Sequence, residues 1–136
     1  MKIIVDTCVW SLALRRGTTS EPEIVQALTQ LIEEFRVQLI GPIRQELLSG
    51  IKLKKQFNDL KQYLSAFPDI PLESQDFEKA AEFFNLCRNA GIQGSNTDFL
   101  ICAVAFHRDF EIFTTDKDFI NYQKHLPIKL YKLRSL

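Results

Sequence analysis

The 136-residue chain carries 17 basic and 17 acidic side chains, so its formal net charge is zero, and 46% of its residues are hydrophobic. That much apolar material fills one core without disulfide or zinc support, and we expect a single domain over residues 1–136. The neutral net charge argues neither for nor against a nucleic-acid partner, which would need a local basic patch.

The cysteines and the longest apolar run indicate in which cellular compartment the protein is expected. Cys8, Cys87 and Cys102 are odd in number and lack CxxC spacing, which indicates reduced core thiols and no zinc site. The apolar run from Phe99 to Phe106 is far shorter than the roughly 20 residues that span a bilayer. We therefore expect a cytoplasmic protein without signal peptide or membrane anchor.

In the first half of the chain, strands are predicted at residues 2–5 and 37–40. Ser20 and Glu23 have the spacing of a capping box and predict a helix that runs to about Phe35. Pro42 suits the first turn of a further helix. The other helices expected here cover residues 8–14, 43–53 and 56–67.

In the second half, Ser74 is expected to cap a helix that reaches Ala90. The residues expected to face inward from that helix are Phe77, Ala80, Ala81, Phe84 and Cys87. A buried helix headed by Asp98 follows, then a strand over residues 111–115 and an edge strand over 128–133. Strands that alternate with helices predict an α/β fold with a mostly parallel central sheet flanked by helices.

Asp6 and Asp116 are each expected directly after a strand, at the edge where α/β sheets bind ligands. Asp98 heads the buried helix, and Glu46 falls at the margin of the apolar face of helix 43–53, where we expect it to be partly buried. Each acid has a structural alternative: a turn or cap for Asp6 and Asp116, a cap with Ser95 for Asp98, and a solvated head for Glu46.

If the four acids converge, they repel one another unless a divalent cation neutralises them. Oxygen ligands without His or Cys suit Mg²⁺ or Mn²⁺, with Asp6, Asp98 and Asp116 as the expected ligands. Such a centre supports phosphodiester hydrolysis. The hydroxyls of Thr7 and Thr115 lie next to the acids in sequence and are expected to support the site.

Two stretches are basic enough to contact RNA, although lysines on a solvated helix face or an edge strand explain them equally well. One stretch holds Lys52, Lys54 and Lys55. The other is the C-terminal tail with Lys124, Lys129, Lys132 and Arg134.

Four segments in order resemble PIN-domain proteins, and specifically the VapC ribonuclease toxins of toxin–antitoxin pairs. They are Ile3 to Thr7, Gln45 to Ile51, Asp98 to Ala105, and Thr114 to Phe119. The resemblance implies a three-layer PIN-like domain in which Asp6, Glu46, Asp98 and Asp116 are the catalytic acids and Asp118 is an outer acid. It also implies RNA cleavage, a homodimer and a small VapB-like antitoxin whose tail blocks the site. Lys117, inside the last segment, joins the candidate RNA contacts.

Other functions on such a fold fit less well. A phosphatase with an aspartate nucleophile needs a second Asp where Cys8 stands, and a phospho-receiver needs an acceptor Asp where the second strand instead runs into Gly41 and Pro42. The remaining alternative is a non-catalytic PIN-fold module that binds RNA or a partner protein. The sequence thus favours a metal-dependent endoribonuclease.

Overall fold

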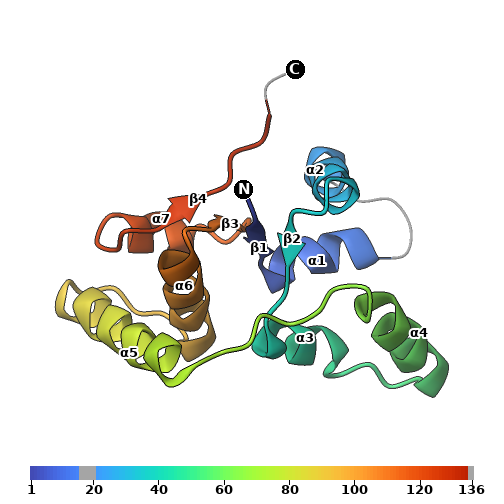
Figure 1. The fold of residues 1–136 in the computed structure, drawn as a ribbon, viewed down its shortest axis with the longest axis horizontal. Coiled ribbons are helices and arrows are strands. Elements are labelled where there is room, and N and C mark those ends of the chain that lie inside the picture. The colour runs from blue at the N-terminus through green and yellow to red at the C-terminus, as the bar shows by residue number, and fades with distance from the viewer. Residues whose placement is uncertain (16–20, 135–136) are drawn as a thin grey trace.

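A four-stranded parallel sheet forms the centre of the computed structural model, which describes residues 1–15 and 21–134 (Figure 1). The strands are β1 (Ile3–Val5), β2 (Val37–Gln38), β3 (Glu111–Phe113) and β4 (Lys129–Leu130), in the order β2-β1-β3-β4. Every neighbouring pair is parallel, with Ile4 opposite both Gln38 and Ile112. The predicted α/β fold with a parallel sheet is confirmed, and β4 occupies the expected edge.

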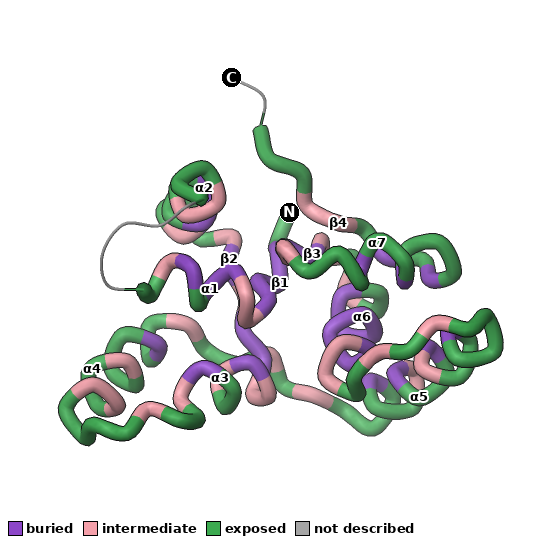
Figure 2. Tube along the Cα trace, turned by 180° about the vertical axis from the view of Figure 1, so that it is seen from behind, coloured by how far each residue is buried: buried purple, intermediate pink, exposed green. Residues whose placement is uncertain are grey.

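Seven helices in the described residues connect and cover the strands. They are α1 (Thr7–Leu14), α2 (Pro22–Glu33), α3 (Gly41–Leu48), α4 (Lys54–Leu64), α5 (Ser74–Asn89), α6 (Asn96–Arg108) and α7 (Asp118–Gln123). The chain segment that connects β1 to β2 leads to one edge of the sheet. The segment that connects β2 to β3 crosses back over β1, because β3 pairs with the other side of β1. Right-handed crossovers place α5 and α6 of the second segment opposite α1 and α2 of the first, whereas α3 packs against α1 and α4 packs against α3. Figures 1 and 2 show α1 and α2 to one side, with α5 and α6 to the other.

The apolar runs that predicted β1 and α6 are the most buried parts of the chain that the structure describes. All three residues of β1 are fully buried, as expected of a central parallel strand covered on both faces. In α6, every residue from Phe99 to Ala105 is buried, and this helix packs on β1 and β3 (Figure 2). One continuous core therefore joins the sheet to α6 from Phe99 onward.

Several predicted element ends are wrong. The helix expected over 43–53 ends at Leu48, because Ser49 adopts an extended conformation and Gly50 has a φ of 84°. The strand expected over 37–40 ends at Gln38, and Leu39 forms an isolated bridge with Asp69 instead. The strand expected over 111–115 ends at Phe113, so Asp116 does not follow it directly. The predicted cap at Ser20 lies outside the described residues.

The inward face of α5 also differs from the prediction. Phe77 and Ala81 are exposed, whereas Asp76 and Phe83 are buried beside Ala80. The N-cap residue of the helix is Glu73 and not Ser74, which is the first helical residue. Glu73 and Asp76 form the capping box. The register is set by Asp76, which makes buried ion pairs with α6. The apolar pattern alone does not contain that information.

In the part of the chain that the structure describes, no helix is long and apolar enough to cross a membrane.

Candidate active site

Asp6 occupies the junction between β1 and α1. Its backbone is extended, and its carbonyl accepts hydrogen bonds from the N–H groups of Val9 and Trp10, so the residue also caps α1. The side chain is only 7% exposed. Oδ1 accepts a 2.8 Å hydrogen bond from the Thr7 N–H. The structure thus bears out the capping role of Asp6, and its buried carboxylate remains a candidate site acid.

Thr114 holds the other oxygen of Asp6. Its hydroxyl donates to Asp6 Oδ2 at 2.8 Å and accepts the Asp116 N–H at 3.0 Å. The expected supporting hydroxyl was that of Thr115, which instead contributes its N–H to Cys8 Sγ at 3.4 Å. Cys8 Sγ also lies 3.6 Å from Asp6 Oδ2. Cys8 is thus a half-buried polar neighbour of the acid and not the core thiol that the sequence predicted.

Asp98 is the third residue of α6. The Ser95 hydroxyl caps the helix by accepting the Asp98 N–H at 3.1 Å, as the spacing predicted. Asp98 Oδ2 accepts a 2.7 Å hydrogen bond from the hydroxyl of Tyr122 on α7. Burial and the adjacent Asp98 raise the pKa of Tyr122, so the phenol keeps its proton and acts as the donor.

Asp116 lies in the loop between β3 and α7 and is exposed. Its Oδ1 accepts the Asp118 N–H at 2.9 Å, which orders the start of α7. Asp118 itself is exposed and helical. Its backbone N–H is the donor to Asp116, and its role as an outer acid stays a prediction.

Glu46 reaches the site from α3. The sequence predicted partial burial, and this is wrong: the residue is exposed, because the helix ends before the positions that were expected to flank it. The Thr7 hydroxyl donates to Glu46 Oε2 at 2.7 Å. Since the Thr7 N–H binds Asp6, Thr7 connects Glu46 to Asp6 through two adjacent hydrogen bonds.

The acids interact through space as well as through these bonds. Burial, and to a lesser extent the charge of Asp116, raises the pKa of Asp6, while hydrogen bonds from Thr114, Thr7 and Cys8 oppose the rise. The pKa of Asp98 is raised first by burial and then by the charges of Asp6 and Asp116. Asp6, Asp98 and Asp116 therefore form one electrostatically coupled centre, built from segments far apart in sequence.

The donor chemistry of this centre suits a hard divalent cation. Carboxylate oxygens that destabilise one another's charge are the ligands that Mg²⁺ and Mn²⁺ accept. Among the described residues, however, no three His, Cys, Asp or Glu side chains are already arranged to hold a metal ion. In the observed arrangement, Asp6 accepts hydrogen bonds from Thr7 and Thr114, and Asp98 accepts one from Tyr122.

The lysines named from sequence lie on the surface. Lys52, Lys54, Lys55 and Lys117 are all exposed, and Lys55 pairs with Asp59 at 3.0 Å. Only Lys117 is adjacent in sequence to a site acid. In the tail, Arg134 pairs with Glu34 at 2.6 Å.

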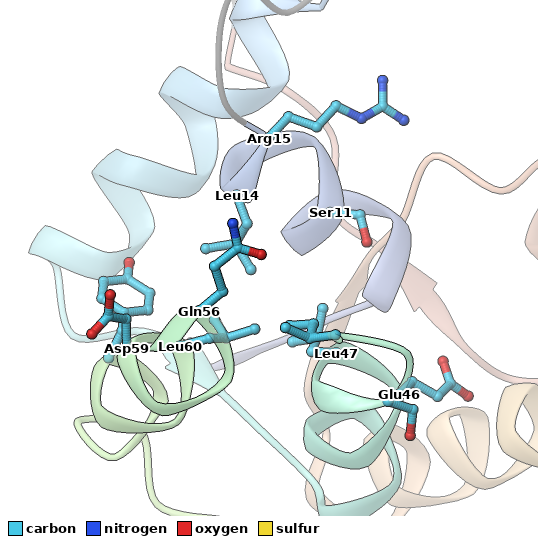
Figure 3. Close-up of a pocket in the computed structure, with 11 residues that line it drawn as sticks. Ser11, Leu14, Arg15, Glu46, Leu47, Gln56, Asp59 and Leu60 are labelled. Carbon is cyan, nitrogen blue, oxygen red and sulfur yellow. The ribbon is translucent and has the colours of Figure 1, made fainter. Parts of the chain in front are cut away.

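A cavity of about 670 Å³ opens between α1, α3 and α4, with Glu46 among its lining residues (Figure 3). In the close-up, Leu14, Leu47 and Leu60 point toward one another from the three helices, while the carboxylate of Glu46 points away from them. A cavity lined by these leucines and by polar side chains such as Gln56 and Asp59 thus lies beside one of the four acids.

Fold and site together define a class: a parallel α/β domain with an acidic centre beyond the carboxyl ends of its strands. The family model of the PIN domain matches residues 3–125. The chain belongs to the PIN domain family, which confirms the family resemblance found in the sequence. A comparison with curated proteins finds no match.

Solved structures share this fold. FitAcB from Neisseria gonorrhoeae is 22% identical, with 98% of this chain and 99% of that chain covered and a TM-score of 0.77. VapBC2 from Rickettsia felis, bound to a DNA fragment from its promoter, is 20% identical over 96% and 98% of the two chains, with a TM-score of 0.75. VapBC-5 from Mycobacterium tuberculosis, of the VapBC family of toxin–antitoxin systems, is 16% identical over 97% and 99%, with a TM-score of 0.68. At these identities the likeness establishes the fold.

Proposed function

We propose that this chain is an Mg²⁺- or Mn²⁺-dependent endoribonuclease and the VapC-type toxin of a cytoplasmic toxin–antitoxin pair. The observation that carries the proposal is that hydrogen bonds bring the acids together: Thr114 links Asp6 to Asp116, and Thr7 links Asp6 to Glu46. A divalent cation would relieve the repulsion among such carboxylates. Membership of the PIN family and the VapBC complexes of the same fold support it.

In this proposal Asp6, Asp98 and Asp116 hold the cation, and Glu46 completes the acidic set from α3. Bound there, the cation would lower the pKa of a water molecule and take up charge on a phosphate oxygen. Thr114 and Thr7 keep Asp6 and Glu46 oriented, through hydrogen bonds of 2.8 and 2.7 Å. Exposed Lys117 and the lysines at 52, 54 and 55 are candidate contacts for RNA phosphates.

We further propose an antitoxin as the inhibitory partner, and a homodimer as the assembly. The cavity beside Glu46 supports the first of these, since its leucines would accept apolar side chains of a bound segment. A segment seated there would lie next to one of the acids, within reach of the site. This is what an inhibitor of cleavage requires.

The test incubates total RNA with the purified protein in Mn²⁺ and in excess chelator, and then maps new 5′ ends. Cleavage is expected with Mn²⁺ and is expected to stop in chelator. Asp6→Asn and Asp98→Asn should each abolish it. A matched control is Glu82→Gln, which neutralises an exposed acid on α5 that pairs with Lys79; it should cut RNA like the wild type.

Cleavage that persists in chelator would contradict the metal mechanism. A different result would favour the non-catalytic binding module: wild type and Asp98→Asn would be equally inert on RNA and would bind the same partner. Thermal melting adds an independent readout, because a ligand that binds only the native state must raise its stability. Mn²⁺ should raise the Tm of the wild type but not that of Asp98→Asn.

A further inference from the structure

Tyr122 is fully buried and delivers its hydroxyl to a site acid. It lies on α7, a short helix that the sequence pattern did not predict, and it donates a 2.7 Å hydrogen bond to Asp98 Oδ2. A hydrogen bond to an ionised carboxylate is stronger than one between neutral groups. This contact therefore acts directly on the orientation of Asp98.

The ring of Tyr122 has little freedom to move. It packs against Phe99, with ring centroids 4.9 Å apart, and edge-on against Phe119, with centroids 5.1 Å apart. Phe99 belongs to α6, next to Asp98, and Phe119 belongs to α7. The contact with Phe99 packs the tyrosine ring against the helix turn that carries Asp98, and the contact with Phe119 restrains the ring within α7, so the hydroxyl stays in place.

Gly94 makes room for this arrangement. A Cβ built on Gly94 would overlap the Tyr122 hydroxyl and would lie 2.8 Å from Tyr122 Cζ and 2.9 Å from Phe99 Cε2. No ordinary side chain fits at that position without moving the tyrosine. The loop before α6 is thus shaped around the hydroxyl that reaches Asp98.

We propose that Tyr122 is a positioning residue, whose hydroxyl holds the Asp98 carboxylate in the orientation in which it binds a divalent cation. This inference rests on the proposed function. Asp6 and Asp116 carry the same charge as Asp98, and their repulsion favours turning its carboxylate away from the centre. The hydrogen bond from Tyr122 resists that rotation and so lowers the free energy needed to assemble the ion site. Hydrogen-bond partners of metal ligands act in this way in other metal sites.

Tyr122→Phe tests the role, because it removes the hydroxyl and keeps the ring that packs in the core. The matched control is Tyr131→Phe, which removes a hydroxyl that interacts with Arg134 and touches no site acid. The Mn²⁺ dissociation constant is measured by electron paramagnetic resonance on the wild type and both variants. Circular dichroism confirms that each is folded.

Tyr122→Phe should weaken Mn²⁺ binding by about 10- to 100-fold, the range seen when such a partner is removed. Its RNA cleavage should fall at limiting Mn²⁺ and recover as Mn²⁺ is raised, whereas Tyr131→Phe should match the wild type in both. In an Asp98→Asn background, Tyr122→Phe should change the remaining Mn²⁺ affinity by much less.

Equal or tighter Mn²⁺ binding by Tyr122→Phe overturns the positioning role while leaving the nuclease proposal standing. So does a loss of cleavage that added Mn²⁺ does not recover. A wild type that neither binds Mn²⁺ nor cuts RNA overturns the nuclease proposal, and the positioning role falls with it.

Discussion

Thr114 donates a 2.8 Å hydrogen bond to Asp6 Oδ2 across 108 residues of sequence. The same hydroxyl oxygen accepts the N–H of Asp116 at 3.0 Å. One small side chain therefore ties the acid that follows β1 to the loop that follows β3. Because these strands are neighbours in the sheet, strand pairing sets the distance between the two acids before any ligand binds.

Thr114→Val should destabilise the fold at neutral pH. Valine has nearly the shape of threonine, but it leaves the Asp6 carboxylate without one of its donors in a site that is only 7% exposed. A hydrogen bond to a charged group contributes about 1.5–3 kcal/mol, and we expect a loss of that order in the free energy of unfolding measured by urea denaturation. The pKa of Asp6 should rise further, since the Thr114 hydrogen bond lowers it.

Thr114→Ser is the control for this change. It keeps the hydroxyl and removes one methyl group, so it should cost about 0.8 kcal/mol or less. If the serine variant lost as much stability as the valine variant, the methyl group and not the hydrogen bond would be the source of the effect.

Asp98→Asn should raise the stability of the metal-free protein at neutral pH. Burial, with the charges of Asp6 and Asp116, raises the pKa of Asp98. A carboxyl whose pKa is higher in the folded state stabilises the fold fully below its unfolded pKa of about 4, and that contribution is lost as the pH rises through the folded pKa. At pH 7 the wild type thus carries a charge that opposes folding, and asparagine removes it.

Thermal melting from pH 3 to 8 in chelator measures this effect. The variant should melt higher than the wild type at pH 7, by about 3–5 °C for each 1 kcal/mol regained, and the advantage should vanish below about pH 4. A variant that melts lower than the wild type at pH 7 would show that the Tyr122 hydrogen bond outweighs the repulsion.

Gly94→Ala should destabilise the protein, since the added methyl group meets Tyr122 and Phe99 at overlapping distances. Overpacking of this kind costs about 1–3 kcal/mol. Tyr122→Phe in the same chain should restore part of the loss, because it removes the atom with the closest overlap. Urea denaturation of the two single variants and the double variant gives the coupling between the positions, and strict additivity would contradict a direct clash.

The sequence pattern predicted those elements whose formation depends on a local run of apolar residues. The apolar run after Met1 gave β1, and the all-round apolar segment after Asp98 gave the buried helix α6. The ends of elements were less predictable, because Ser49 and Gly50 stop α3 through backbone conformation that the apolar spacing does not report. This error also affected Glu46, because its predicted burial assumed that Gly50 and Leu53 continue the helix, and they do not.

The supporting residues of the site were predictable only in part. Thr7 was identified because it adjoins Asp6, yet Thr114 and Tyr122 act across long sequence separations that spacing does not reveal. One signal for Tyr122 was present: Phe119 and Tyr122 are three residues apart behind Asp118, which suits a short helix. The polar contact of its hydroxyl depends on tertiary packing.

Asp76 illustrates the same limit and gives the last prediction. Its side chain is 1% exposed at the start of α5, and it accepts hydrogen bonds from both terminal nitrogens of Arg108, at 2.9 and 3.1 Å. His107 contacts it at 2.8 Å. Arg108 first, and His107 with it, hold the pKa of Asp76 well below its usual range. The cluster clamps the start of α5 to the end of α6.

Asp76→Asn should therefore cost far more than an exposed ion pair does. Breaking a buried pair costs about 3–5 kcal/mol, and we expect the lower end because the Arg108 side chain is 23% exposed. Asp59→Asn removes the acid of an ion pair whose side chains are 87% and 61% exposed, and it should cost less than about 1 kcal/mol. A lowered pKa means that Asp76 stabilises the fold above its unfolded pKa of about 4 and loses this contribution as the pH falls below it. In urea denaturation the gap between wild type and Asp76→Asn should thus be full at pH 7 and narrow below about pH 4, and equal costs for the two variants would contradict a buried clamp.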